Sequence, residues 1–175
     1  MFKNTIFRRM TALVLTLALA AAAALPGLAV YPMPIQTASE TEAVYLFNAD
    51  TGKTILNQNA DQQQYVASLT KLMTALLLLE SGKDLNGEVT VPTALTQEFR
   101  DIQNANGTTM GLRIGETVRR IDLLNAMLIV SANDAASVIA YDVGGSVLDF
   151  VKQMNARAQE LGCTGTNFTC AHGLF

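Results

Sequence analysis

The feature that most constrains this 175-residue chain is a predicted helix at residues 68–80 that is apolar on almost every side. Its apolar positions are Leu69, Leu72, Met73 and residues 76–79. A helix that is apolar around its circumference has to be buried. Residues 72–79 are too few to span a bilayer, which takes about 20 residues. The sequence therefore predicts a core helix inside a folded domain.

The first 29 residues have the three-part layout of a secretory signal peptide. Lys3, Arg8 and Arg9 form a basic start, an uncharged apolar run covers residues 10–25, and small residues precede a cleavage position after Ala29. That run is short for a membrane span, so a retained membrane anchor is only the alternative. We expect export, cleavage after Ala29 and an extracytoplasmic location.

The remaining composition excludes several classes of function. Residues 30–175 hold nine of the 12 basic residues and all 15 acidic ones, which argues against a nucleic-acid partner. A disulfide between Cys163 and Cys170 is permitted in an exported chain, but two cysteines do not make a disulfide-stabilised scaffold. With His172 as the single histidine, a zinc site is not expected, and no cofactor is implied. We interpret His172 as a residue that orders a loop.

The order of predicted elements indicates an α+β domain. A lead-in segment at 30–41 precedes hairpin strands at 43–47 and 53–56, and helices follow at 68–80, 121–130, 133–142 and 146–161. Residues 84–118 are expected to be irregular, with one strand candidate at 88–91. Two strands do not complete a sheet domain. We therefore expect residues 42–175 to be the N-terminal part of a domain that is cut short at its C-terminal end.

Ser68 and Lys71 form the first candidate for chemistry. Residues i and i+3 share one face of a helix, so the hydroxyl and the amine can meet. The field of the helix N-terminus and burial both lower the pKa of a lysine at this position. A neutral amine can then take the serine proton, and the free Ser68 N–H can stabilise an oxyanion. The alternative is that Ser68 only caps the helix and Lys71 is solvated.

Ser131 and Asn133 form the second candidate. They interrupt an apolar stretch, so polar side chains emerge between two buried helices. Such a junction can place a second hydroxyl and an amide against Ser68 and Lys71. The alternative is again capping, because an asparagine at a helix start needs no further cause.

Ser-x-x-Lys followed by Ser-x-Asn belongs to the motif set of penicillin-binding proteins and class A β-lactamases. Longer segments make the resemblance more specific, at residues 45–53, 59–61, 67–74, 111–116, 124–136 and 171–174. From about residue 42 to its end, the chain resembles the low-molecular-mass D-alanyl-D-alanine carboxypeptidases, which are serine-type penicillin-binding proteins. This resemblance implies the penicillin-binding protein/serine β-lactamase-like transpeptidase fold.

The resemblance also implies roles. Ser68 is the nucleophile and forms the acyl-enzyme, Lys71 is the general base, and Ser131 relays a proton. Asn133 positions Lys71 and, with Ser131, contacts the substrate. The implied partners are a peptidoglycan pentapeptide ending in D-Ala-D-Ala and β-lactam antibiotics. Membrane association is implied only through a C-terminal region beyond this sequence.

One family motif has no counterpart in the 175 residues. The third motif, Lys-Thr-Gly, is lacking. Residues 51–53 contain the same three residue types in another order, but they lie in an early turn. By the resemblance, half of the oxyanion hole and the residues that usually bind the substrate carboxylate are therefore missing. The alternative interpretation is a catalytically inactive fragment. A class A serine β-lactamase is disfavoured, because Glu160 is not followed by Leu-Asn.

Overall fold

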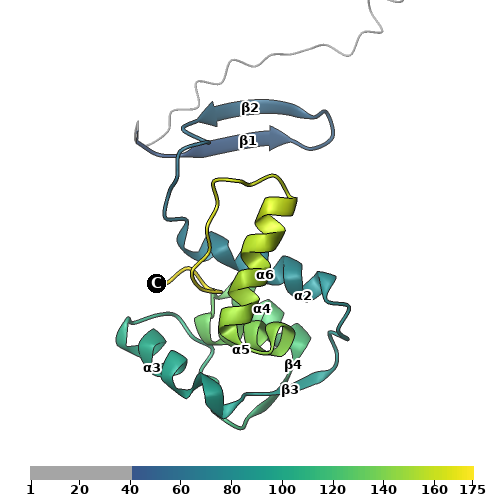
Figure 1. Cartoon of the computed structure of the whole chain (residues 1–175), viewed down its shortest axis with the longest axis vertical. Coiled ribbons are helices and arrows are strands. Elements are labelled where there is room, and N and C mark those ends of the chain that lie inside the picture. The colour runs from purple at the N-terminus through teal and green to yellow at the C-terminus, as the bar shows by residue number, and fades with distance from the viewer. Residues whose placement is uncertain (1–40) are drawn as a thin grey trace, which may run out of the picture. The chain divides into compact units, whose positions relative to one another are not determined.

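The computed structural model describes residues 41–175, which fall into two compact units, 41–60 and 61–175 (Figure 1). The predicted signal peptide at 1–29 and the predicted lead-in up to residue 40 lie outside the described residues. Within 41–175, no helix combines the length and the apolar character that a membrane crossing requires.

The first unit is an antiparallel hairpin of β1 (Val44–Asn48) and β2 (Lys53–Gln58). Val44 pairs with Gln58, and the register shifts between Leu46 and Phe47. The turn contains Gly52 at a φ of +67°, a conformation that glycine adopts without steric cost. Both predicted strands are confirmed, and the second extends two residues further than expected.

The second unit is built around five helices. They are α2 (Thr70–Glu80), α3 (Thr96–Asn104), α4 (Arg120–Ile129), α5 (Asn133–Gly144) and α6 (Val147–Glu160). Short 3-10 turns, η1 (Ala67–Leu69) and η2 (Thr93–Leu95), precede α2 and α3. The predicted helices at 121–130, 133–142 and 146–161 are confirmed to within two residues at each end.

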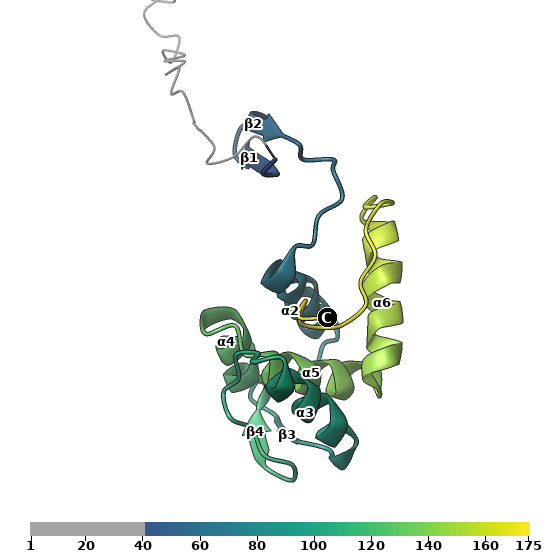
Figure 2. The ribbon, with the colours of Figure 1, turned by 90° about the vertical axis from the view of Figure 1, so that its left-hand side faces the viewer.

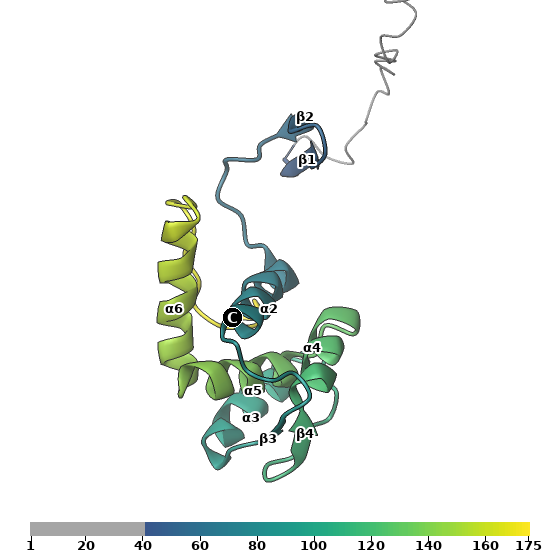
Figure 3. The same cartoon turned by 90° about the vertical axis from the view of Figure 1, so that its right-hand side faces the viewer.

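Helix α5 is the centre of this unit. All of its residues from 133 to 140 are buried, and it packs against α2, α3, α4 and α6. Figures 2 and 3 show α2 on one side of α5 and α3 with the short strands on the other. Val138 and Ile139 join one apolar core with Leu78, Leu123 and Met127, among others. A helix buried on every side needs such neighbours to cover it.

The chain turns sharply between α5 and α6. Gly145 ends α5 in the left-handed conformation that favours glycine, with a φ of +77°. Ser146 then caps α6, because its hydroxyl accepts a hydrogen bond from the Asp149 N–H at 3.0 Å. This turn packs Phe150 and Met154 of α6 into a second core cluster with Ala171.

The strand candidate at 88–91 is confirmed, but the prediction that the rest of residues 84–118 is irregular is wrong. The segment holds α3 and one strand of a short antiparallel pair, β3 (Glu88–Thr90), whose partner β4 (Thr117–Arg119) closes it. Helix α3 is largely polar, and Phe99 and Ile102 form only a narrow apolar stripe. Because Ile102 is fully buried, tertiary packing stabilises a helix that is only nine residues long.

Helix α2 also differs from its prediction. It begins at Thr70, so Ser68 lies in the preceding 3-10 turn, and Leu69 and Leu72 are 64% and 61% exposed. Within residues 61–175, helices α4, α5 and α6 pack on the other face of α2, where Ala75 and Leu78 are buried. The described residues of this unit therefore bury one face of α2 instead of its whole circumference.

Candidate active site

Ser68 lies in the turn that leads into α2, where it is exposed to solvent. The residue before it, Ala67, has a φ of +48°, which is a costly conformation for a non-glycine residue. Among the described residues, no backbone carbonyl in a turn or loop accepts a hydrogen bond from the Ser68 N–H, while the next amide, that of Leu69, donates to the Val66 carbonyl at 3.1 Å. The turn thus presents a hydroxyl and its own amide together.

Lys71 occupies the first turn of α2 and is only 2% exposed. Its Nζ lies 3.1 Å from Ser68 Oγ and 2.9 Å from the backbone carbonyl oxygen of His172. Burial lowers the pKa of Lys71, and a smaller opposing effect comes from the neighbouring Cys170 sulfur. A buried amine with a lowered pKa is a suitable acceptor for a serine proton.

Ser131 joins the same site from the junction of α4 and α5. Its Oγ donates a hydrogen bond to Ser68 Oγ at 2.8 Å. The backbone of Ser131 has a φ of +60°, in the left-handed region, so the junction is turned to aim this side chain at the serine. Ser68 Oγ therefore contacts the Lys71 amine and the Ser131 hydroxyl at once.

Asn133 is placed differently. Its side-chain amide and its backbone N–H both donate to the carbonyl oxygen of Thr108, at 3.0 and 2.8 Å. Among the hydrogen bonds of residues 41–175, none joins Asn133 to Lys71 or Ser68. In this structure Asn133 anchors the loop that follows α3, and three of the four sequence-derived candidates meet at one point.

Sequence reasoning gave no role to Asp134, the next residue. Its buried carboxylate accepts hydrogen bonds from the backbone N–H groups of Met110, Gly111, Leu112 and Ala135, at 2.9–3.0 Å. Asn133 and Asp134 together fix residues 108–112 beside the site. The available signal was an acidic residue directly before the small and apolar residues of a predicted buried helix, since buried charges need partners.

The segment from Cys170 to Leu174 closes the site from the far end of the sequence. Thr74 lies about one helical turn after Lys71 on α2, and its Oγ1 donates a hydrogen bond to the Ala171 carbonyl at 2.6 Å. Lys71 donates to the carbonyl of the next residue, His172. Gly173 lies against the Ala67 carbonyl oxygen, so a Cβ at position 173 would overlap that oxygen. This segment therefore touches the serine turn and the lysine helix together.

This close approach predicts a large stability effect for Gly173→Ala. Gly173 has a φ of +74°, and left-handed backbone costs a residue with a Cβ roughly 1–2 kcal/mol. Overpacking against the Ala67 backbone adds about 1–3 kcal/mol. Denaturant unfolding of the purified protein should show a loss of at least about 2 kcal/mol relative to wild type.

The matched control for that prediction is Gly162→Ala. Gly162 has a similar φ of +82°, but nothing lies within 4 Å of the position that its Cβ would occupy. It therefore reports the backbone cost alone. Equal losses for the two variants would show that the Gly173 contact does not matter.

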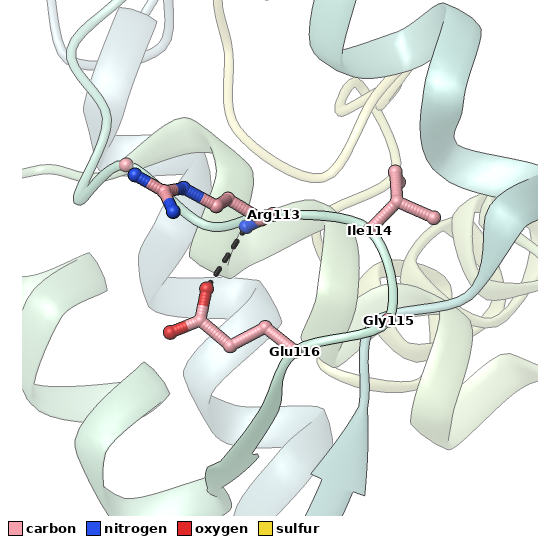
Figure 4. A pocket seen from close by; sticks show the side chains of 5 residues that line it. Arg113, Ile114, Gly115 and Glu116 are labelled. Carbon is pink, nitrogen blue, oxygen red and sulfur yellow. Dashed lines mark hydrogen bonds between the residues drawn. The ribbon is translucent and has the colours of Figure 1, made fainter.

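Two hollows are visible on the surface of the second unit. One of about 410 Å³ is lined by Ser68, Lys71, Ser131 and apolar neighbours from α2 and α4, including Leu72 and Met127. The larger hollow, of about 530 Å³, lies on the turn at residues 111–116, where Glu116 accepts a hydrogen bond from the Arg113 N–H (Figure 4). The smaller hollow is the candidate active site, because it contains the nucleophile and its base.

The other reactive side chains do not form a second centre. Cys163 and Cys170 are both free thiols, and no group of three His, Cys, Asp or Glu residues within 41–175 could hold a metal ion. Burial acts to raise the pKa of Cys170, but hydrogen bonds with His172 and nearby backbone groups lower it to about 6. The arrangement as a whole suits nucleophilic acyl transfer by Ser68.

Comparisons with known proteins agree with this chemistry. A family model described as D-alanyl-D-alanine carboxypeptidase matches residues 32–175. The chain is 33% identical over 142 residues to D-alanyl-D-alanine carboxypeptidase DacF of Bacillus subtilis, covering 79% of this chain and 35% of that protein. It is 36% identical over 146 residues to DacA of Haemophilus influenzae, covering 81% and 35%. The chain thus spans about a third of the length of these relatives.

Solved structures give the same result. The Streptomyces K15 DD-transpeptidase matches with a TM-score of 0.66 at 30% identity, covering 74% of this chain and 51% of that one. Penicillin-binding protein 5 of Haemophilus influenzae matches with a TM-score of 0.60 at 35% identity, covering 70% and 36%.

Proposed function

The chain belongs to the D-alanyl-D-alanine carboxypeptidase family of serine peptidases, and we propose that it forms the nucleophile-bearing part of an enzyme that trims peptidoglycan stem peptides. The expected fold of penicillin-binding DD-peptidases is confirmed by the solved structures it resembles. The observation that best supports the proposal is the contact of Ser68 Oγ with both Lys71 Nζ and Ser131 Oγ.

In the proposed reaction, Ser68 Oγ attacks the carbonyl carbon between the two terminal D-alanines of the stem peptide. Lys71 takes the hydroxyl proton as the new C–O bond forms. The C–N bond then breaks, and Ser131 relays a proton to the departing D-alanine amine. Water hydrolyses the resulting ester, which releases the shortened peptide and restores Ser68. β-Lactams acylate the same serine.

The oxyanion that forms during this attack needs hydrogen-bond donors. The Ser68 N–H is one candidate donor, since it is unused by the backbone hydrogen bonds of the described residues. A Lys-Thr-Gly motif, which the family resemblance leads one to expect, does not occur in the 175 residues. We therefore propose that the second donor and the carboxylate-binding residues come from outside this sequence.

Fluorescent penicillin and mass spectrometry test the proposal directly. We expect the purified full-length protein to carry one covalent adduct, on the peptide that contains Ser68, and to release D-alanine from a peptide ending in D-Ala-D-Ala. An adduct on Ser131 would reverse the assignment of the nucleophile. Rapid loss of the adduct with turnover of the antibiotic would indicate a β-lactamase instead.

The same D-alanine assay distinguishes an active from an inactive fragment. Expressed alone, residues 30–175 should release little or no D-alanine, because a single oxyanion donor and an incomplete substrate site remain. Turnover close to that of the full-length protein would mean that these residues already hold the complete site.

We also propose that the protein is exported and acts outside the cytoplasm. The basic, apolar and small-residue order of residues 1–29 supports this, and we expect cleavage after Ala29. Intact-mass measurement on the extracytoplasmic protein should find residue 30 at the N-terminus. Finding Met1 still attached would contradict the proposal of a cleaved signal peptide.

A further inference from the structure

His172 is a fully buried ionisable residue that the proposed reaction does not use. Besides its contact with the Cys170 side chain, its ring makes two further hydrogen bonds. Nε2 lies 3.1 Å from Glu98 Oε1, and Nδ1 accepts a hydrogen bond from the Leu174 N–H at 3.1 Å. Because Nδ1 is an acceptor, Nε2 carries the hydrogen and donates it to Glu98. Both ring nitrogens therefore fix the orientation of the His172 backbone.

That backbone is part of the active site. The His172 carbonyl oxygen accepts a hydrogen bond from Lys71 Nζ at 2.9 Å, and the only other acceptor of this amine within residues 41–175 is Ser68 Oγ. Burying an amine without enough hydrogen-bond acceptors costs free energy, so the His172 carbonyl strongly influences where Lys71 Nζ lies. The position of the base thus depends on a residue 101 positions later in the chain.

Glu98 ties this arrangement to two further helices. It lies on α3, and its Oε1 also accepts a hydrogen bond from Ser137 of α5 at 3.1 Å. The hydrogen bond from His172 lowers the pKa of Glu98, against the opposing effect of partial burial. Glu98 therefore remains a carboxylate and a strong acceptor for the imidazole.

We propose that Glu98 and His172 are positioning residues, which hold the His172 carbonyl oxygen against Lys71 and so set the distance between Lys71 Nζ and Ser68 Oγ. This inference rests on the proposed function, in which Lys71 is the base. A displacement of about 1 Å far from the reacting atoms can cost on the order of 10²-fold in rate. Neither side chain touches the substrate in this scheme. Their removal should therefore slow the acylation step and leave the non-covalent affinity for the substrate nearly unchanged.

The test uses the rate of acylation by a fluorescent penicillin in the full-length protein. His172→Leu removes both ring hydrogen bonds and should slow acylation by about 10- to 100-fold. The non-covalent affinity for the antibiotic should change by less than about threefold, since RT ln 3 is below 1 kcal/mol. His172→Gln keeps an N–H donor near the position of Nε2 and should recover much of the lost rate.

A control variant separates positioning from general loosening of the loop. Asn155 of α6 holds the same C-terminal segment through hydrogen bonds to the Phe168 N–H and carbonyl, at 2.7 and 2.9 Å. Asn155→Ala should lower the melting temperature and leave the acylation rate near that of wild type. An equal slowing in Asn155→Ala and His172→Leu would overturn the inference, as would wild-type acylation by folded His172→Leu.

If His172→Leu does not fold, Glu98→Ala decides the question. The Glu98 side chain is 24% exposed, so water can enter after its truncation and the protein is less perturbed. Glu98→Ala should slow acylation, and a wild-type rate would overturn the inference. Ser68→Ala and Lys71→Ala are assayed in parallel. If those two variants still acylate normally, the proposed function has failed, and the result is distinct from failure of the positioning role.

Discussion

Replacing Ser68 with alanine is expected to abolish covalent labelling by penicillin and the release of D-alanine. The hydroxyl of Ser68 is the only one that contacts both Lys71 Nζ and a second serine among the described residues, at 3.1 and 2.8 Å. Without it, no oxygen occupies the position that the base can deprotonate, so no acyl-enzyme forms. Labelling intensity on a denaturing gel measures the loss directly.

Ser131→Ala is the matched control for this experiment. It also removes one hydroxyl from the same hydrogen-bonded pair, but it leaves the proposed nucleophile and its base in place. We expect this variant to label more slowly and still to carry the adduct on Ser68. Residual labelling of Ser68→Ala at the wild-type rate would place the nucleophile elsewhere.

The local part of this site could be predicted from the sequence because it depends on spacing within one turn. Ser68 and Lys71 are three residues apart, and this separation brings their side chains together in the 3-10 and α-helical turns that they occupy. The polar break at Ser131 likewise indicated a junction between buried helices. What the break could not give was the φ of +60° that turns Ser131 toward the nucleophile.

The distant contacts could not be predicted in this way. Lys71 is held by the His172 carbonyl, and a backbone oxygen has no signature in the sequence. Asn133 was expected to face Lys71, whereas its amide donates to the carbonyl of Thr108 in a segment that was predicted to be irregular. Both contacts depend on loop paths, which residue patterns within a window do not determine.

The predictions for helices α2 and α3 were wrong in opposite directions, and for the same reason. The apolar circumference of α2 predicted burial on all sides, but Leu72 is exposed in the unit that residues 61–175 form. The polar sequence of α3 predicted no helix, but burial of Ile102 and the contact of Glu98 with His172 hold it in place. In both cases the neighbouring elements decide whether the helix forms and how much of it is buried. The hydrophobic pattern of a segment describes that segment alone and not the elements that pack against it.

Replacing Lys71 with alanine is expected to slow acylation of Ser68 by about 10²- to 10⁴-fold, the usual contribution of a general base. Burial lowers the pKa of Lys71, which increases the fraction of neutral amine available at neutral pH. The acylation rate of the wild-type protein should therefore rise with pH through a pKa below the ordinary lysine value. Stopped-flow acylation across a pH series measures both effects.

Lys71→Arg separates the base from a mere hydrogen-bond donor. A guanidinium can still donate to the His172 carbonyl, but it stays protonated at every accessible pH and cannot accept the serine proton. If Lys71 serves only as a donor or a positive charge, the arginine variant should acylate at close to the wild-type rate. If Lys71 is the base, the arginine variant should be as slow as Lys71→Ala and should lose the rising limb of the pH profile. Fast acylation by Lys71→Arg would therefore contradict the assignment, even though Ser68 remained the nucleophile.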